Sequence, residues 1–392
     1  MNEGKTVDVL VIGAGPAGGS AAYHASKQKL NVLLAEEHEK IGEPVHCGEC
    51  LSQTAEERLG EKIPKEAVAQ KVNGVRVVFP DGTNPILYEK GYVLEKHIFE
   101  KWLAGKAQDL GTELSLGTRV QNLQRENNYW NIETSKGNIK AKIVIDGSGA
   151  AGIGNRLLGM NPKFSVTTGV QYELLDIPND ELLDFYLWPR LSPNGYLWMI
   201  PKNDGRANVG LVTSEITNAK KYLDQFLKEK NWEKKTKVKT FGGPIPSSGP
   251  LEKTFDDGIM LIGDAAGFTS PLFEGGTQLG LVSGKFAGET AKEAIEKNDF
   301  SRQALQSYEK KWKKEFPSYE KIITGKNKLY SFSDEELNRI GKILPQKMGQ
   351  TTPMGNARIL FNLLTQNRNL YKKGALEALL AFRYSRAKHY GW

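Results

Sequence analysis

The sequence predicts a Rossmann-like α/β domain that is interrupted by an antiparallel β-sheet domain of α+β character and followed by a C-terminal helical region. Three observations lead to this prediction. A short apolar strand at residues 7–12 runs into a glycine-rich turn, a similar strand ends in Gly-Asp at residue 264, and the segment 164–241 is rich in alternating strands. From about residue 300 onward the pattern is helical.

Composition and charge exclude several classes of protein. Of the 392 residues, 39% are apolar and 25% are charged, as in ordinary soluble enzymes and unlike disordered chains. Two cysteines rule out a disulfide framework, and no apolar run approaches the roughly 20 residues that span a bilayer. The first residues lack the layout of a signal peptide. We therefore expect a cytoplasmic protein, with a peripheral position on the inner face of the membrane as the alternative, and we expect no bound metal and no nucleic-acid partner. The net charge of +7 favours anionic partners.

The first forty residues carry the order of elements typical of dinucleotide binding. The strand Val7–Ile12 leads into Gly13-x-Gly15-x-x-Gly18 and a helix of small residues, and a second strand ends at Glu36. Gly13 permits a tight turn, Gly15 lets a pyrophosphate approach the backbone, and Gly18 allows close helix–strand packing. The acid at the strand end can accept ribose hydroxyl groups. The residues expected to bind the cofactor here are Gly13, Gly15, Pro16, Ala17, Gly18 and Glu36.

A second glycine signal indicates a flavin. An apolar strand ends at Gly263-Asp264, and Gly275-Gly276 then precedes a helix full of small residues. An acid at such a strand end can meet a ribityl or ribose hydroxyl, and the amides at the helix start can face the electron-rich N1/O2 edge of a reduced isoalloxazine. We therefore expect FAD, with these four residues among its contacts.

A third glycine motif could be mistaken for a second nucleotide-binding site. Asp146 ends another strand, and Gly147-x-Gly149-x-x-Gly152 imitates a dinucleotide fingerprint. The helix that it would open soon reaches Pro162, and no strand ending in an acid follows at the proper distance. We interpret Asp146 and Gly147 as a turn beside the same flavin.

These three motifs, in this order, resemble the aromatic-hydroxylase-like flavoprotein superfamily over residues 7–291. More narrowly, the chain resembles the geranylgeranyl reductase family. That resemblance rests on Gly42-Glu-Pro-Val-His-Cys47-Gly48-Glu49, on Pro193-Asn-Gly-Tyr196-Leu-Trp198-Met-Ile200-Pro201, and on Gly243–Pro250. The second segment matches the family's PxxYxWxFP motif, with Ile200 in place of Phe. Lys96 stands where such flavoproteins often carry an arginine near the FAD.

The resemblance implies a flavin-dependent oxidoreductase that acts on CH–CH groups. Members of the family reduce double bonds of geranylgeranyl chains on archaeal ether-lipid precursors, and others act on chlorophyll precursors, quinones or free prenyl diphosphates. For this chain it implies FAD as cofactor, an isoprenoid lipid of the digeranylgeranylglycerol phospholipid type as substrate, and NAD(P)H or a ferredoxin as electron donor.

The motifs also divide the chain into alternating pieces. Three pieces build the FAD-binding domain, two build the substrate domain, and the last is helical. The expected pieces are 1–71 (FAD-binding), 72–91 (substrate-domain strands), 92–160 (FAD-binding), 161–249 (antiparallel substrate domain), 250–299 (FAD-binding) and 300–392 (C-terminal helices).

Cys47 lies in a loop shaped by glycine and proline, and Cys50 follows it at CxxC spacing. Four interpretations remain open: a metal ligand, a redox dithiol, a structural thiol pair, and a group on the substrate side of the flavin. The family resemblance favours the last, and it implies that Cys47 and Gly48 also approach the cofactor.

The implied reaction needs a proton donor. An isolated double bond is not activated for hydride attack, so protonation of one carbon must accompany hydride delivery to the other, in a pocket poor in water. Cys47, Glu49 or a bound water could donate, and we name Cys47 and Glu49 as the catalytic candidates.

An aromatic strand supplies the expected substrate surface. Alternation places Tyr196, Trp198 and Ile200 on one face of a strand, and Trp188 adds apolar area nearby. A prenyl chain gains about 0.8 kcal/mol for each buried CH₂-sized group, so an apolar tunnel can hold a long chain by packing alone.

The last segment, 370–392, has basic residues around an apolar stripe. Such a helix either rests on an anionic membrane or packs on its own protein with a charged edge, and we favour packing. Two other functions remain open on the same scaffold: an oxygen-dependent hydroxylase, and a flavin-bound lipid carrier without turnover.

Overall fold

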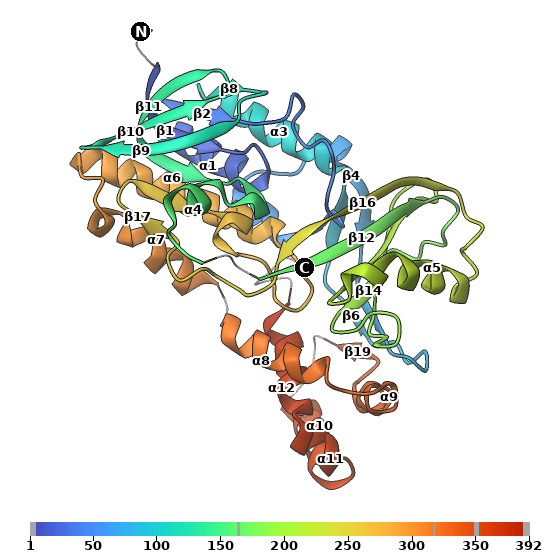
Figure 1. Ribbon diagram of the computed structural model, residues 1–392. Coiled ribbons are helices and arrows are strands. Elements are labelled where there is room, and N and C mark those ends of the chain that lie inside the picture. The colour runs from blue at the N-terminus through green and yellow to red at the C-terminus, as the bar shows by residue number, and fades with distance from the viewer. Residues whose placement is uncertain (1–4, 163–164, 317, 349–352, 387–392) are drawn as a thin grey trace.

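A computed structural model describes residues 5–162, 165–316, 318–348 and 353–386 of the chain. Its described strands form three sheets. In Figure 1 the first sheet and its helices lie at the upper left, the second sheet lies to the right, and the C-terminal helices extend below. This arrangement confirms the predicted fold class.

The first sheet is the Rossmann-like core. Its main path runs in the spatial order β17 (Phe255–Asp256), β18 (Ile259–Leu261), β11 (Gly137–Asp146), β1 (Lys5–Ile12), β2 (Val32–Ala35) and β8 (Glu113–Ser115). All neighbours on this path are parallel except β17 and β18. The hairpin β9 (Val120–Glu126) and β10 (Tyr129–Thr134) pairs with β11. Because β1, β2 and β11 run parallel, their carboxyl ends meet at one edge.

Two long helices pack on this sheet because small residues line their contact. The helix α1 (Pro16–Lys27) lies against α6 (Thr277–Lys297). A Cβ added at Gly284 would lie 2.3 Å from the carbonyl oxygen of Ala17, and one added at Gly288 would lie 2.8 Å from the amide nitrogen of Ala25. The two backbones therefore approach closely, which holds the start of α6 near the glycine turn.

The second sheet is antiparallel at its centre. Its order is β16 (Lys237–Pro246), β12 (Val166–Leu174), β15 (Ala207–Thr213), β14 (Tyr196–Pro201), β13 (Leu182–Tyr186), β5 (Gly74–Val78), β6 (Ile86–Leu87) and β19 (Lys347–Met348). Only β13–β5 and β6–β19 pair in parallel. The helix α5 (Ala219–Glu229) covers one face, and the other face joins the main core. Each strand therefore divides its side chains between two environments.

Smaller elements join the two large sheets. A third sheet has the order β3 (Cys50–Ser52), β7 (Gly91–Leu94) and β4 (Val68–Val72). The helices beside it and along the rim of the first sheet are α2 (Thr54–Leu59), α3 (Lys96–Gln108) and α4 (Ile153–Leu158). The described single-turn helices are η1 (Lys65–Ala67), η2 (Gly149–Ala151), η3 (Ile216–Asn218) and η4 (Gly263–Ala266).

The C-terminal part is helical as predicted, apart from the short strand β19. Its helices are α7 (Arg302–Glu315), α8 (Tyr319–Leu329), α9 (Asp334–Ile343), α10 (Pro353–Thr365), α11 (Arg368–Lys373) and α12 (Ala375–Tyr384). Of the segment 370–392, residues 387–392 lie outside the described part of the chain. Among the helices described, none combines the length and apolarity needed to cross a bilayer.

Candidate functional site

A cavity of about 400 Å³ lies at the carboxyl edge of the first sheet. Its wall includes Gly13, Gly15 and Glu36 from the first strand–helix–strand unit, together with Gly147 and Asp264. The three glycine motifs of the sequence therefore converge on one space, which agrees with our rejection of a second nucleotide site at Gly147.

The glycines of the turn have different tasks. A Cβ at Gly18 would lie 1.8 Å from the carbonyl oxygen of Gly13, and one at Gly13 would lie 2.6 Å from that of Gly147. Gly13 also has a φ of +89°. Around Gly15 nothing lies within 4 Å of an added Cβ, so this position borders open space. Gly13 and Gly18 thus serve close packing, and Gly15 leaves room for a bound group.

The first residues of α1 also help to form the binding cavity. Pro16 begins the helix, where a backbone N–H has no partner within the helix. Ala17 packs against Gly263 and Gly280, where an added Cβ would lie 2.8 and 3.3 Å from its own Cβ. The helix N-terminus, with its unpaired N–H groups and partial positive charge, is therefore held at the cavity.

Glu36 lines the cavity and is 9% exposed. Its Oε2 accepts a hydrogen bond from the Ala14 amide at 2.7 Å, and its Oε1 lies 2.6 Å from Nδ1 of His38. The carboxylate is thus fixed at the end of β2. His38, which the sequence analysis did not single out, also lines the cavity.

Asp146 shapes the cavity without lining it. The side chain is 0% exposed, and its oxygens accept hydrogen bonds from the amides of Ser148 (3.0 Å) and Gly154 (2.7 Å). Burial raises the pKa of this carboxyl. Its place is inside the turn that presents Gly147 and the following residues, so it is a positioning residue rather than a direct contact with the cavity.

The Gly-Asp turn after β18 brings a second acid to the cavity wall. Burial raises the pKa of Asp264, and the nearby Lys96 opposes that effect. A Cβ at Gly276 would lie 3.0 Å from Oδ1 of Asp264. The carbonyl oxygen of Gly275 accepts a hydrogen bond from the Ser270 amide at 2.8 Å. Gly275 and Gly276 thus lie behind Asp264, immediately before α6.

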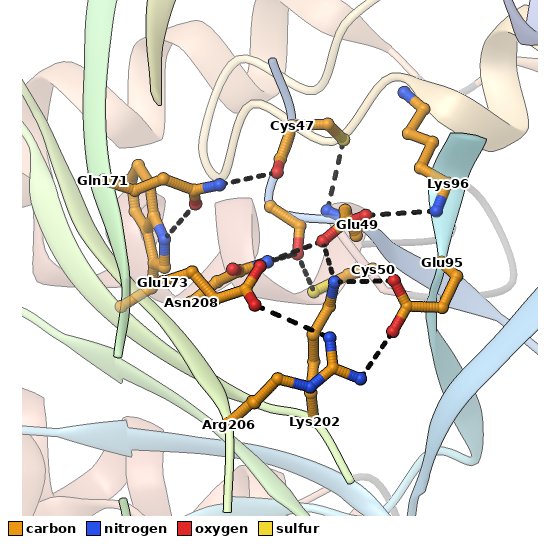
Figure 2. Close-up of polar contacts among 12 residues, drawn as sticks. Cys47, Glu49, Cys50, Glu95, Lys96, Gln171, Glu173, Lys202, Arg206 and Asn208 are labelled. Atoms are coloured by element: carbon orange, nitrogen blue, oxygen red, sulfur yellow. Dashed lines mark hydrogen bonds and ion pairs between the residues drawn. The ribbon is translucent and has the colours of Figure 1, made fainter. Parts of the chain in front are cut away.

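Residues 42–49 form the cysteine loop, which lies between this cavity and the second sheet. Residues 42–46 line the cavity, and Figure 2 shows the contacts of Cys47 and Glu49 with side chains of the second sheet. Sγ of Cys47 accepts a hydrogen bond from the Glu49 amide at 3.2 Å, and its carbonyl oxygen accepts one from Nε2 of Gln171 at 2.8 Å. The ammonium of Lys96, which lines the cavity, also contacts Cys47. Burial lowers the pKa of Lys96, but Cys47, Glu100 and Asp264 outweigh it, so the net shift is upward. Lys96 is therefore a partly buried cation between the thiol and two acids.

Glu49 is held in a buried network of polar contacts. One carboxylate oxygen accepts a hydrogen bond from the Lys96 amide at 3.1 Å. The other lies 2.8 Å from Nδ2 of Asn208 and 2.5 Å from Nζ of Lys202. With 2% of the side chain exposed, this carboxylate is fully engaged, so the geometry gives Glu49 the role of positioning the loop and not that of a free acid.

Cys50, the first residue of β3, lies close to Cys47, and both are free thiols. Burial raises the pKa of the Cys50 thiol, and Cys47 and Glu49 raise it further. Within the described residues there is no cluster of three or more histidine, cysteine or acidic side chains that could hold a metal.

The side chains of β14 alternate between the two faces of the sheet, as the sequence predicts. Tyr196, Trp198 and Ile200 belong to the main core, whereas Leu197 and Met199 face α5. Nε1 of Trp198 donates to Oε1 of Gln171 at 3.0 Å, on the residue that also holds Cys47. A Cβ at Gly48 would lie 2.9 Å from Cδ1 of Ile200. The face of β14 that carries Tyr196, Trp198 and Ile200 is called the aromatic face. It is thus in direct contact with the cysteine loop.

Trp188 does not join this face, and its expected place there is wrong. It packs edge to face on Phe226 of α5, with ring centroids 5.5 Å apart. Register explains the error. Phe185 pairs with Trp198 and shares its face, so Tyr186 and then Trp188 point to the other side.

Known proteins match the chain over most of its length. A model of the geranylgeranyl reductase catalytic domain matches residues 165–245, and one of FAD-dependent oxidoreductases matches residues 8–156. A digeranylgeranylglycerophospholipid reductase of Methanocaldococcus jannaschii is 33% identical over 361 residues, which cover 87% of this chain and 91% of the relative. The chain belongs to the geranylgeranyl reductase family. It is a flavin-dependent oxidoreductase with FAD as its cofactor.

Solved structures agree with this assignment. The crystal structure of a geranylgeranyl bacteriochlorophyll reductase-like protein from Thermoplasma acidophilum has a TM-score of 0.85 and 31% identity to this reductase, over 94% of this chain and 98% of that one. A flavin-dependent brominase has a TM-score of 0.69 and 17% identity, over 97% of this chain and 98% of that one, which shows a shared fold alone.

The cavity of this reductase fits FAD in three respects. Gly15 borders open space where a pyrophosphate can approach, the N-terminus of α1 offers unpaired N–H groups, and Glu36 fixes an acid at the end of β2. Lys96 adds a partly buried positive charge to the wall. These residues would hold the dinucleotide.

The residues that connect the cysteine loop to the second sheet were not among those expected from the sequence. Gln171, Lys202 and Asn208 are each less than 5% exposed, yet they are polar and lie within or next to apolar strands. Buried polar residues are uncommon unless they have partners. A polar side chain inside an apolar strand is the signal that could have identified them.

Proposed function

We propose that this reductase saturates isolated double bonds of geranylgeranyl chains on a digeranylgeranylglycerol phospholipid. One observation carries the proposal: the loop of Cys47 and Gly48 contacts both Lys96 at the cofactor cavity and Ile200 on the aromatic face. Relatives of this chain are named digeranylgeranylglycerophospholipid reductases.

The chain's own residues account for the requirements of the reaction. When bound, reduced FAD supplies a hydride. The apolar face of Tyr196, Trp198 and Ile200 excludes water from the alkene, which keeps charge that develops on carbon from being quenched. Cys47 is the proposed acid on the substrate side. The adjacent Lys96 ammonium stabilises the thiolate that remains after the proton has left.

The substrate test is an anaerobic incubation of the holoenzyme with chemically reduced FAD and the lipid. We expect a product heavier by two hydrogens for each saturated bond, measured by mass spectrometry, and a large loss of rate for Cys47→Ala with flavin binding retained. A mass shift of zero across several prenyl lipids would overturn the proposal. Consumption of oxygen with a hydroxylated product would instead identify a hydroxylase.

The electron donor is proposed to be NAD(P)H or a ferredoxin. The test is bleaching of the bound flavin under anaerobic conditions with each donor in turn. A flavin that neither donor reduces would overturn this part of the proposal.

We also propose contact with an anionic membrane through α10. Large apolar side chains are exposed along it, with Met354 82% and Phe361 64% exposed. Basic side chains are exposed beside them, at Arg358 on α10 itself and at Arg368 and Lys372 on α11. In Figure 1 these helices lie at the end of the molecule farthest from the first sheet. Apolar and basic side chains on one exposed helical surface are typical of interfacial binding.

Some of the basic residues of segment 370–392 form ion pairs within the protein. Lys373 pairs with Glu336 at 2.5 Å, and Arg386 pairs with Glu89 at 2.7 Å. Vesicles with anionic lipid should bind the full chain, and Phe361→Ser should weaken that binding without changing activity on detergent-solubilised lipid. Equal binding to neutral vesicles, or no effect of the substitution, would contradict membrane contact through α10.

A further inference from the structure

The side-chain amide of Gln171 on β12 lies between the cysteine loop and the aromatic face, and Gln171 is 4% exposed. Its Nε2 donates a hydrogen bond to the carbonyl oxygen of Cys47 at 2.8 Å, and its Oε1 accepts one from Nε1 of Trp198 at 3.0 Å. A carbonyl oxygen can only accept and an indole N–H can only donate. A single orientation of the Gln171 amide therefore satisfies both partners.

A glycine in the intervening strand lets the indole reach this amide. Gly210 on β15 pairs with Gln171 on one side and with Trp198 on the other. A Cβ at Gly210 would lie 2.5 Å from Cβ of Gln171 and 2.5 Å from Cζ2 of Trp198. The indole thus occupies the space that a side chain at position 210 would fill, and its N–H crosses β15 to reach β12.

The hydrogen bond from Gln171 is made at Cys47 itself, as Figure 2 shows. It holds the backbone from which the thiol projects. The next carbonyl oxygen of the loop, that of Gly48, accepts from Nδ2 of Asn208 at 3.4 Å, which is longer and weaker. The short bond to Gln171 therefore sets where the Cys47 backbone lies relative to the aromatic face.

We propose that Gln171 is a positioning residue for the reduction, which fixes the thiol of Cys47 relative to Trp198 and the aromatic face. Gln171 acts through Cys47 and not on the lipid. The proton must reach one carbon of the alkene while the hydride reaches the other, and a small displacement of such a donor lowers the rate steeply. This inference deepens the proposed function and rests on it.

Two substitutions separate the two hydrogen bonds. Gln171→Met keeps an unbranched side chain of similar length and removes both bonds. Gln171→Glu keeps an oxygen that can accept from the indole, but its carboxylate has no hydrogen for the carbonyl oxygen of Cys47. The matched control is Gln124→Met, which makes the same change at an exposed position of β9.

The first measurement needs no turnover. Iodoacetamide is added to the holoenzyme, and mass spectrometry follows the labelling of Cys47, which is a free and partly exposed thiol. Loss of its hydrogen bond should loosen the loop, so Gln171→Met should be labelled about 2- to 10-fold faster than the wild type. Gln124→Met should be labelled at the wild-type rate. Equal rates for Gln171→Met and the wild type overturn the inference whatever the activity.

The second measurement observes the indole of Trp198. In the full chain labelled with ¹⁵N-tryptophan, the indole N–H signal that is absent in Trp198→Phe belongs to this residue. Its proton should move to higher field in Gln171→Met, which has lost the acceptor, and not in Gln171→Glu, which retains one. An unchanged signal in Gln171→Met overturns the inference, because the amide would then not hold the indole.

The third measurement is steady-state reduction of the lipid by the holoenzyme. Gln171→Glu should lower kcat by about tenfold or more and leave KM nearly unchanged, because the indole keeps its partner while the proton donor is displaced. A change confined to KM overturns the positioning role. This variant also carries the test if Gln171→Met does not fold.

A pH series adds a rescue within the same variant. At low pH the carboxyl introduced by Gln171→Glu is protonated, and its O–H can again donate to the carbonyl oxygen of Cys47. The ratio of its kcat to that of the wild type should rise as pH falls, whereas the ratio for Gln171→Met should stay constant. Cys47 and Lys96 are present in all three chains, so their titration cancels in these ratios. A constant ratio for Gln171→Glu overturns the positioning role alone, whereas no reduction by the wild type overturns the proposed function.

Discussion

The carboxylate of Glu49 lies 2.5 Å from the ammonium of Lys202, and both side chains are 2% exposed. Lys202 directly follows β14, whereas Glu49 lies two residues after Cys47. The pair therefore fixes the cysteine loop to the aromatic strand. Glu95 lies 3.4 Å from the same ammonium and 2.7 Å from Nη2 of Arg206, which extends the network toward β15 (Figure 2).

Breaking this pair should be strongly destabilising. We expect Lys202→Met to lower the free energy of unfolding by about 3–5 kcal/mol, because it leaves the Glu49 charge buried without its partner. Denaturant unfolding measures this loss, and Glu49→Gln in the same chain should recover much of it. The matched control is Arg190→Met, whose ion pair with Glu229 is 41% and 32% exposed and should matter by less than about 1 kcal/mol. Equal losses at both sites would contradict this role of the buried pair.

The glycine turn gives a prediction that separates folding from cofactor binding. Gly15→Ala should leave the stability of the cofactor-free chain nearly unchanged, because nothing lies within 4 Å of the added Cβ, but it should weaken FAD binding. Gly18→Ala should disrupt the fold, because its Cβ would lie 1.8 Å from a carbonyl oxygen. Thermal unfolding and flavin titration test both. If Gly15→Ala binds FAD as the wild type does, the cofactor is not held by this turn.

The contact between the cysteine loop and β14 can be tested by adding a methyl group on one side and removing one from the other. Gly48→Ala places a Cβ 2.9 Å from Cδ1 of Ile200, so it should displace the loop and lower stability. Ile200→Val removes that methyl group and should rescue the variant. A double-mutant cycle measures the coupling between the two positions. Simple additivity would mean that the two residues do not touch.

Much of the first sheet could be predicted because its geometry is encoded locally. The turn at Gly13 needs particular residue types at fixed spacing, and these are visible in any single sequence. The site depends in addition on contacts between distant segments. Glu49 was named as a candidate proton donor for the implied reaction, and only the folded chain brings Lys202 and Asn208 to its oxygens.

Trp188 shows that the sequence of one strand does not tell which face of its side chains is the substrate side. Alternation tells which residues share a face along one strand, but the register with the next strand decides which face that is. The pairing of Phe185 with Trp198 could not be read from the sequence, so Trp188 was expected to add apolar area to the substrate surface, although it lies on the other side of the sheet.

Stability should depend on pH through Glu274. Its pKa is raised in the folded chain from 4.5 to about 7, so between these values the folded state holds a proton that the unfolded state has lost. The free energy of unfolding therefore falls as pH rises through this window, by about 3 kcal/mol in all. The difference between wild type and Glu274→Gln isolates this effect, because other groups cancel. A difference that is constant over the window would contradict the buried acid.

The central proposal is that this cavity would hold FAD beside the face of Tyr196, Trp198 and Ile200, where the flavin would supply a hydride for an isolated alkene. The most direct test is to reduce the bound flavin under strict anaerobiosis, add the geranylgeranyl lipid, and follow the flavin absorbance. We predict that the oxidised spectrum returns with the unsaturated lipid and not with its fully saturated analogue. A flavin that stays reduced with both lipids and is reoxidised only by oxygen would contradict the account.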